Sequence, residues 1–216
     1  KRMRWGSSRE EFVRPAHWIV LLFGTELISA DILGLPTTTS TFGHRFLHPE
    51  SIKLNSADEY PEKLRKEGVV EPSFQQRKEL IREQVLHEAK VKKATAIINE
   101  NLLDEVTGLV EWPVALTGNF DPAFLEVPKE ALISSLEKHQ KYFYLLDKNK
   151  NLLPHFITIS NLISADPEQV IKGNEKVIGP RLADAAFFYD KDKSRKLDSH
   201  IDTLKRVVFQ KELGSL

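Results

Sequence analysis

The segment from Lys138 to Tyr144 combines side chains that proteins use to bind nucleic acid. It reads Lys-His-Gln-Lys-Tyr-Phe-Tyr, with lysines that can contact phosphates and rings that can stack on bases. Four of its residues are therefore predicted to contact nucleic acid: Lys138, His139, Lys141 and Tyr142. The alternative is structural, because the lysines would also complement the negative end of a helix dipole and the aromatic rings would also pack in a core. The sequence leaves both interpretations open.

Two further groups of basic residues are candidates for phosphate contacts. His44 and Arg45 follow a run of five hydroxyl residues, Thr37–Thr41, and hydroxyl groups beside an arginine suit phosphate. Lys176 and Arg181 lie in a stretch that is predicted to be helical. The structural alternatives are a capped loop beside a core aromatic residue for the first group and an ordinary solvated helix face for the second.

The sequence contains none of the common catalytic or nucleotide-binding motifs. It contains no P-loop, Rossmann glycine fingerprint, nucleophile elbow or His-Glu-x-x-His. His44 and His48 have a spacing that a metal could use, but Pro49 and the predicted strand separate the two side chains. The adjacent carboxylates of Asp104 and Glu105 point in different directions on a helix. We therefore predict no catalytic, cofactor-binding or metal-binding residue in this chain.

Composition narrows the class of protein. The chain has 216 residues, no cysteine, and 31 basic side chains against 31 acidic ones. The missing cysteines exclude a disulfide scaffold and a thiolate nucleophile, and they suit a reducing compartment. A net charge of zero excludes a uniformly basic nucleic-acid binder. A basic surface must therefore arise from local charge separation, and residues 101–128 indeed carry five acids and no base.

Hydrophobic patterning and turn residues predict an α+β fold with a mainly antiparallel sheet and packed helices. Two apolar runs around Gly24-Thr25 predict a hairpin, and the threonine run predicts a sheet edge. Residues 42–46 predict a strand with Phe42, His44 and Phe46 on one face. The other predicted strands are 114–120, 142–147 and 155–160.

Capping residues and prolines mark the starts of the predicted helices. These helices are 56–67, one opened by Pro72, 102–110 capped by Asn101, one opened by Pro128, one capped by Asp166, and 197–213. The helix capped by Asp166 is predicted to break or kink at Gly179-Pro180. The helix opened by Pro72 is predicted to bury Leu80, Ile81, Val85 and Ala89.

The chain is predicted to be a piece of a longer protein, because it begins at Lys1 without an initiator methionine. We predict an α+β core domain over residues 1–165 and a helical segment over 166–216 that leads toward a next domain. The longest apolar run near the start, Trp18–Phe23, has six residues, far fewer than the ~20 needed to cross a bilayer. We therefore expect no membrane partner.

Eight strings in chain order resemble the β subunit of bacterial glycyl-tRNA synthetase. They are Phe12–Trp18, Thr41–Phe46, Glu105–Pro113, Val127–Ile133, His139–Phe143, Leu153–Asn161, Gly173–Val177 and Arg181–Phe188. No single string is decisive, but the eight together are specific, and the resemblance covers essentially the whole chain.

The resemblance implies a segment of glycine–tRNA ligase, a heterotetramer of α and β chains that attaches glycine to tRNA. In that family the α chain uses ATP and Mg²⁺ to form the adenylate, and the β chain chiefly engages tRNA, so no cofactor is implied for this segment. The implied partners are the α subunit, tRNA(Gly) and the remaining domains of the β chain, and the implied location is the cytoplasm. The region is also loosely similar to the B3/B4 domain of phenylalanyl-tRNA synthetase β, a mixed α+β fold associated there with editing.

Three roles for the segment therefore stay open. The first is a tRNA-contacting module that supports aminoacylation. The second is a structural module that joins subunits or domains, which predicts a large exposed apolar patch. The third is a vestigial editing-like domain, for which no editing residues are carried over because no matching pattern is visible.

Overall fold

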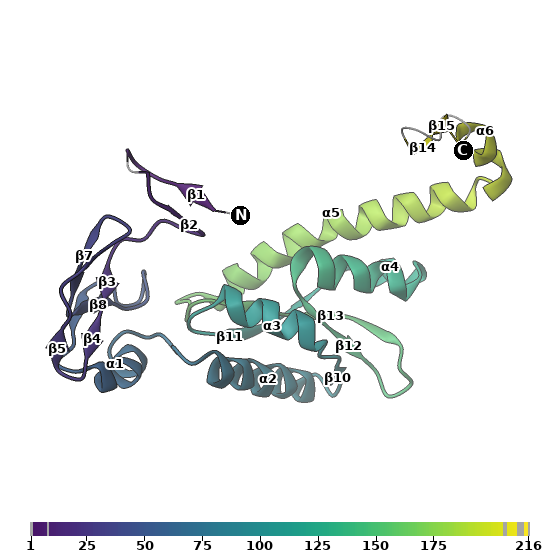
Figure 1. The fold of residues 1–216 in the computed structure, drawn as a ribbon. Helices are drawn as coiled ribbons and strands as arrows, with labels where there is room; N and C mark the ends of the chain where they lie inside the picture. Colours follow the sequence, from purple (N-terminus) through teal and green to yellow (C-terminus); the bar gives the residue numbers. More distant parts are fainter. Residues whose placement is uncertain (1, 8, 205–206, 211–213, 216) are drawn as a thin grey trace. The chain divides into compact units, whose positions relative to one another are not determined.

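The computed structural model describes residues 2–7, 9–204, 207–210 and 214–215 (Figure 1). Contacts divide the chain into two compact units. Unit 1 comprises Lys1–His87, Ile98–Ala115 and Ile159–Ala165, and unit 2 comprises Glu88–Ile97, Leu116–Thr158 and Asp166–Leu216. Each unit is thus assembled from stretches that lie far apart in the sequence. The predicted division at residues 165 and 166 concerns the organisation of a longer chain and stays a prediction.

Short strands make up the first half of unit 1. They are β1 (Met3–Arg4), β2 (Glu11–Phe12), β3 (Ile19–Val20), β4 (Leu22–Phe23), β5 (Glu26–Leu27), β6 (Asp31–Ile32), β7 (Leu35–Thr38), β8 (Ser40–Phe42) and β9 (Ser51–Lys53). The pairs β1–β2, β4–β5 and β8–β9 are antiparallel. The predicted hairpin around Gly24-Thr25 is confirmed as β4–β5, and Gly24 has the positive φ of +59° that its turn requires.

Only part of the threonine run forms a sheet edge as predicted: Ser40 and Thr41 lie in β8, which pairs with β9 in a two-stranded sheet, whereas Thr37 and Thr38 lie in β7. β7 lies between β3 and β6, pairing in parallel with β3 and antiparallel with β6. The Thr37 hydroxyl donates to the carbonyl oxygen of Ile28 at 2.7 Å and accepts from the amide of Ala30 at 3.0 Å. The hydroxyl therefore satisfies the backbone of a neighbouring segment instead of facing solvent from an edge.

The predicted strand over residues 42–46 is wrong beyond Phe42. A Cβ on Gly43 would lie only 2.5 Å from both the Cα and the carbonyl oxygen of Gly68, so the two backbones meet here. The amide of His44 donates to the Gly68 oxygen at 2.6 Å. The chain turns inward at this contact, which buries His44 and leaves Phe46 74% exposed. The two side chains therefore do not share a face.

Three helices complete unit 1: α1 (Tyr60–Lys66), α2 (Phe74–Val91), whose last turn belongs to unit 2, and α3 (Glu100–Leu109). The buried face of α2 is confirmed at Ile81, Val85 and Ala89, whereas Leu80 is 38% exposed. α3 is capped by Asn99 and not by Asn101 as predicted. The Asn99 side chain accepts from the Asn101 amide at 3.0 Å, because Asn99 has the extended backbone of a cap.

Ion pairs hold α2 against α3. Arg82 lies 2.9 Å and Lys78 lies 3.0 Å from the carboxylate of Glu100, at the start of α3. Hydrogen bonds from Arg82 and then Lys78 lower the pKa of Glu100 to about 2. The carboxylate also faces the positive end of the α3 dipole, so the ion pairs and the dipole act in the same direction.

Unit 2 is built on a four-stranded sheet with the order β10-β12-β13-β11. Its strands are β10 (Thr95–Ala96), β11 (Val114–Asn119), β12 (Phe143–Leu146) and β13 (Leu152–Ser160), and its main helices are α4 (Lys129–Ser134) and α5 (Pro167–Lys193). β12 pairs antiparallel with both β10 and β13, which confirms the second predicted hairpin. Together with the paired strands of unit 1, this arrangement confirms the α+β fold class.

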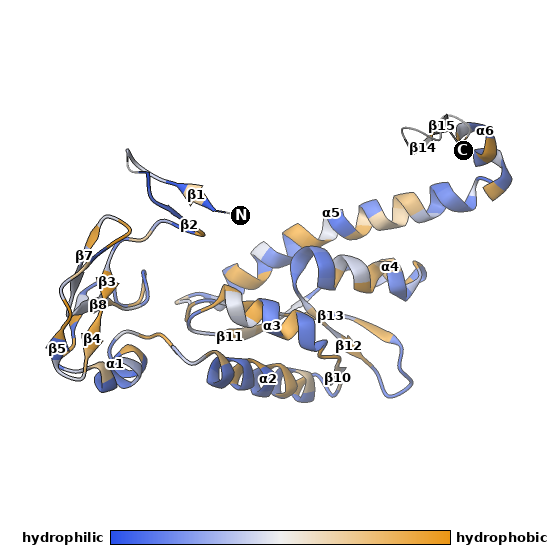
Figure 2. Ribbon diagram, in the orientation of Figure 1, coloured by the Kyte–Doolittle hydropathy of each residue, from blue (hydrophilic) through white to orange (hydrophobic). Residues whose placement is uncertain are grey.

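The core of unit 2 centres on a pair of stacked rings. Tyr142 and Phe156 have ring centroids 4.4 Å apart and an interplanar angle of 13°. Residues from α4, α5, the sheet and the segments that connect them surround the two rings: Phe120, Val127, Leu132, Leu136, Leu152, Ile178 and Leu182. A Cβ on Gly118 would collide with the Phe156 ring, so the glycine provides the space for that ring. The hydrophobic residues are orange in Figure 2.

The two predictions for the C-terminal helices need correction. Asp166 caps α5 as predicted, accepting from the Gln169 amide at 3.2 Å, but α5 runs through Pro180 without a break. Ile178 and Leu182 on either side of the proline are fully buried, so core packing outweighs the one lost hydrogen bond.

The predicted helix over 197–213 is wrong after Leu204. A 3-10 turn (Leu197–His200) and α6 (Ile201–Leu204) are followed by two strands, β14 (Val208–Gln210) and β15 (Gly214–Ser215). Residues 205–206 and 211–213 of that prediction lie outside the described residues. Throughout the described part of the chain, no helix has the length and apolar character needed to cross a membrane.

Candidate nucleic-acid interface

The helical segment that follows α4 presents basic side chains to solvent. Ser135–His139 is a π-helical turn in which Lys138 and His139 are exposed. Lys141 then takes a positive φ of +60°, a conformation typical of the residue that follows a helix end. The wider turn and this left-handed residue leave the two basic side chains outside and direct the chain into β12.

Tyr142 belongs to the core instead of the surface. Its ring is only 3% exposed and stacks on Phe156, and its hydroxyl donates to Oδ1 of Asn174 at 2.7 Å. Burial raises the pKa of Tyr142 to about 12, so the phenol stays protonated. The sequence left two interpretations open for Tyr142, and the structure shows the core position. The buried ring has no open face on which a base could stack.

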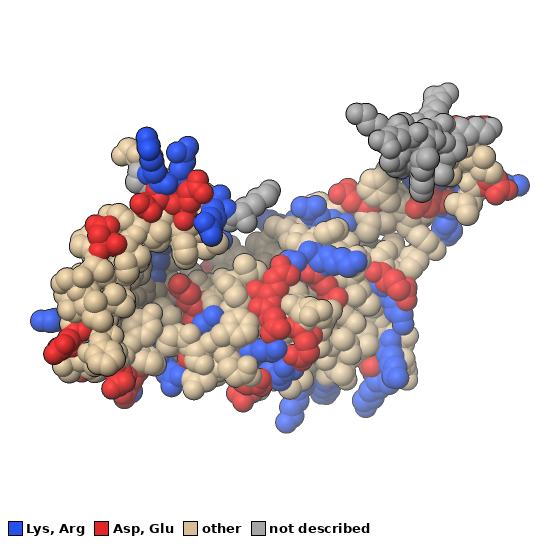
Figure 3. Space-filling model, viewed as in Figure 1, with Lys and Arg blue, Asp and Glu red and all other residues tan. Residues whose placement is uncertain are grey.

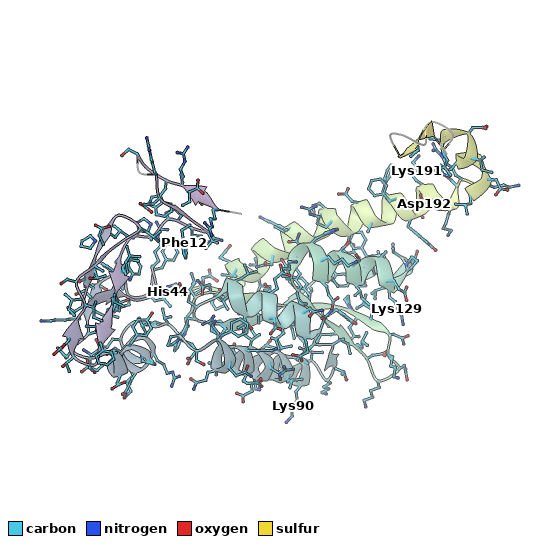
Figure 4. All side chains as sticks on the ribbon, in the orientation of Figure 1. Phe12, His44, Lys90, Lys129, Lys191 and Asp192 are labelled. Atoms are coloured by element: carbon cyan, nitrogen blue, oxygen red, sulfur yellow. The ribbon has the colours of Figure 1, made fainter. Side chains whose placement is uncertain are left out.

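The predicted residues of α5 are exposed, but only one of them shares a hollow with the π-helical turn. Arg181 and His139 line a hollow of about 490 Å³ together with Asp184 and Asp192, while Lys176 is exposed elsewhere on the helix. Asp192 is labelled in Figure 4. Two carboxylates balance the cations here, so this hollow has no excess of positive charge. Figure 3 likewise shows acidic and basic side chains interspersed over the visible face.

His44 is a structural residue of unit 1. Its Nε2 donates to the carbonyl oxygen of Asn161 at 2.7 Å, and its Nδ1 accepts from the amides of Phe46 and Leu47 at 3.3 and 3.2 Å. These bonds fit a neutral imidazole with its proton on Nε2. The ring, labelled in Figure 4, is 1% exposed and so has no nitrogen left for a phosphate. Its neighbour Arg45 is exposed, which makes His44 the support of the loop that presents Arg45.

Arg45 lines a hollow of about 780 Å³ within unit 1, and two other arginines line it as well. These are Arg14 and Arg77, which sequence reasoning missed. Arg14 comes from the N-terminal stretch and Arg77 from α2, so no local pattern links them to Arg45. The only signal in the sequence is the basic character of residues 1–14, which does not say where those cations point.

A polar chain in unit 2 orients another histidine. Nδ1 of His155 donates to Oδ1 of Asn119 at 2.7 Å, and the Asn119 amide groups donate to the Glu175 carboxylate at 2.8 and 3.2 Å. Burial and the nearby Lys92 charge lower the pKa of His155. The imidazole is thus held with Nε2 unprotonated, so that this nitrogen can accept a hydrogen bond from water. Within the described ranges, no group of three or more His, Asp or Glu residues could hold a metal ion.

We predict that Lys92→Gln raises the pKa of His155 toward 6.5 without reaching it, because burial is the larger cause and remains. The imidazole resonances in an NMR pH titration measure this pKa. Since the unfolded chain takes up the proton more readily than the folded one, stability should fall as pH drops below about 6.5. Lys90→Gln, at an exposed position of α2 (Figure 4), is the matched control and should leave the pKa unchanged. An equal shift of the His155 pKa in both variants would contradict the role given to the Lys92 charge.

Comparison with known proteins gives one consistent result. The chain matches, over residues 1–216, the family described as "Glycyl-tRNA synthetase beta subunit". It is 58% identical over 216 residues to the protein named "Glycine--tRNA ligase beta subunit" from Chromohalobacter salexigens. It is 52% identical to the proteins of the same name from Hahella chejuensis and Marinobacter nauticus. All of this chain is covered in each comparison, and it spans 31% of the length of each relative.

Proposed function

Because the chain belongs to the glycyl-tRNA synthetase β-subunit family, we propose that it supports the ATP-dependent attachment of glycine to tRNA by contacting or positioning the tRNA. In this proposal the segment itself carries no bond-making residue. The α subunit uses ATP and Mg²⁺, and the segment acts in the cytoplasm with the α subunit, tRNA(Gly) and the remaining domains of the β chain as partners.

The observation that carries this proposal is the exposed basic end of the π-helical turn. Lys138 and His139 are exposed, while Tyr142 anchors the same segment in the core through Phe156 and Asn174. A basic side chain on an anchored backbone can meet a phosphate without first ordering a loop, so less binding free energy is lost to conformational entropy. Phosphate contacts of this kind position an RNA without reading its sequence.

We predict that Lys138→Glu in the whole enzyme, with full-length β and α subunits, weakens tRNA(Gly) binding. The plot of log K against log salt concentration should lose roughly 1 unit of slope, because one phosphate contact is removed. Fluorescence anisotropy with labelled tRNA at several salt concentrations measures both quantities, and kcat/KM for aminoacylation should fall in parallel.

Lys148→Glu in the exposed β12–β13 turn changes the net charge by the same amount and serves as the control. If Lys138→Glu leaves affinity, salt slope and aminoacylation like those of the control, the RNA contact is lost as an explanation.

A second candidate, a module that joins subunits or domains, is favoured by the exposed apolar side chains of unit 1. Phe23 is 77%, Phe46 74% and Ile28 45% exposed, and β3 and β4 are coloured orange in Figure 2. Exposed apolar residues in such number are typical of interaction surfaces. This candidate would be preferred if Lys138→Glu left tRNA binding unchanged.

A further inference from the structure

A polar hollow of unit 1 brings together side chains that are distant in the sequence. It has a volume of about 780 Å³, within the range of small-molecule sites. Its lining comes from six places in the chain: Arg14, residues 44–46, Tyr60 with Leu64, residues 70–77, residues 108–111, and Asn161. All of them belong to unit 1.

Asn161 fastens three walls of this hollow to one another. Its backbone oxygen accepts from His44, and its side-chain oxygen accepts from the amides of Glu111 and Trp112 at 2.6 and 3.2 Å. The amide of Glu71 in turn donates to the Glu111 backbone oxygen at 2.9 Å. The hollow is therefore preorganised by hydrogen bonds between distant segments, two of them half-buried, which lowers the entropic cost of binding a ligand.

The charge of the lining is mainly positive, with three arginines against one carboxylate, Glu111. Arg77 is fixed, because its guanidinium donates to the backbone oxygens of Thr107 and Glu71. Arg14 and Arg45 are both exposed, and neither forms an ion pair or hydrogen bond with another residue in the described part of the chain. Two arginines with all their donors available suit a phosphate, which accepts bidentate hydrogen bonds from a guanidinium.

Two aromatic residues and one acceptor complete the hollow. Phe46 is 74% exposed and Tyr60 is 38% exposed, so both offer ring surface for stacking. Burial and then Glu111 raise the pKa of Tyr60, which keeps its hydroxyl protonated as a donor. The Glu111 carboxylate can accept from a ribose hydroxyl or a base amino group.

We propose that this hollow binds one unpaired nucleotide of the bound tRNA, with its phosphate on Arg14 and Arg45 and its base against Phe46 or Tyr60. The arginines alone would suit inorganic phosphate as well. The rings, the carboxylate and the volume together favour a complete nucleotide, and an unpaired one because a paired base has no open faces for stacking. The inference deepens the proposed tRNA-contacting function and rests on it.

Gly108 of α3 permits a test by filling the hollow. A Cβ at this position would meet no atom within 4 Å, and Gly108 lines the hollow, so the side chain of Gly108→Phe starts in open space at its wall. In the whole enzyme with tRNA(Gly), we expect this variant to weaken binding by roughly tenfold, the scale of one lost stacked base. Arg45→Gln should weaken binding by roughly fivefold and reduce the salt slope by about 1.

Matched controls are available in unit 2. Arg195→Gln removes one exposed arginine, and Val91→Phe adds a ring at an exposed position of α2. Both should bind tRNA like the unmodified enzyme, and circular dichroism of every variant checks the fold. In addition, a photoreactive benzoyl-phenylalanine at position 46 should cross-link to an unpaired nucleotide of the tRNA.

The outcomes separate this inference from the proposed function. If Lys138→Glu weakens tRNA binding but Gly108→Phe and Arg45→Gln do not, the hollow is not a nucleotide site and the tRNA-contacting role stands. If only Arg45→Gln has an effect, or if position 46 cross-links to a base-paired region, the contact lies outside the hollow and the inference is overturned. If inorganic phosphate or adenosine 5′-monophosphate binds to the enzyme, Arg45→Gln abolishes that binding, and neither ligand changes the affinity for tRNA, the hollow is a small-molecule site and the inference is also overturned.

Discussion

Gly43→Ala is expected to lower the free energy of unfolding of unit 1 by about 3 kcal/mol or more. The added methyl group would lie 2.5 Å from the Cα and the carbonyl oxygen of Gly68, and a backbone cannot swing aside as a flexible side chain can. Moving the two segments apart would also break the 2.6 Å hydrogen bond from the His44 amide to the Gly68 oxygen. The substitution therefore combines overpacking with the loss of a hydrogen bond at the same point.

Tryptophan fluorescence during denaturant unfolding can measure this loss selectively. The chain has three tryptophans, Trp5, Trp18 and Trp112, and all of them belong to unit 1. Gly108→Ala is the matched control, since it makes the same chemical change in α3 where the methyl group meets nothing. That variant should gain roughly 0.5–1 kcal/mol, because alanine is the better helix residue. Similar unfolding midpoints for the two variants would show that the contact at Gly43 is not limiting.

Phe156→Ala is expected to destabilise unit 2 by about 3–5 kcal/mol. The ring is fully buried, stacks on Tyr142 at 4.4 Å, and fills the space over Gly118. Removing it leaves a cavity between the sheet and the helices, and it also deprives Tyr142 of its stacking partner.

Hydrogen exchange read by mass spectrometry suits this measurement, because unit 2 has no tryptophan. Amides of β12 and β13 should exchange faster in Phe156→Ala than in the unmodified protein. Amides of unit 1 are measured in separate peptides and give the stability of that unit independently. Phe187→Ala removes the same side chain from α5 at a position that is 55% exposed, and it should change stability by less than about 0.5 kcal/mol. Equal acceleration of exchange by the two substitutions would mean that Phe156 does not carry the core.

Local signals in the sequence predicted local structure well. The Gly24-Thr25 turn, the Asp166 cap and the buried face of α2 at Ile81 and Val85 each depend on residues within one or two turns of each other. The predicted strand through His44 failed because the contact with Gly68, and the bond to Asn161 across 117 positions of sequence, decide that region. Long-range contacts of this kind leave no periodic pattern in the sequence.

The candidate sites also divide into residues that local sequence predicts and residues that only long-range contacts bring together. Lys138 and His139 could be selected from their neighbours alone, and the structure places both at the surface. Tyr142 carries the same local signal but is buried, because its ring fits between Phe156 and α5. The hollow around Arg45 depends on six separate segments, so its other two arginines could not be grouped with it before the fold was known.

The discontinuous build of unit 1 has a consequence for the order of folding. The stretch Ile159–Ala165 supplies Asn161, which fastens His44 and the segment after α3. During synthesis unit 1 therefore stays incomplete until residue 161 has emerged from the ribosome, by which time every strand of the unit 2 sheet has been made. Contacts between residues so far apart also raise the contact order, which slows folding because a long loop must close first. The last step in forming this part of the protein is thus expected to be the docking of a seven-residue stretch, Ile159–Ala165, onto a unit that began more than a hundred residues earlier.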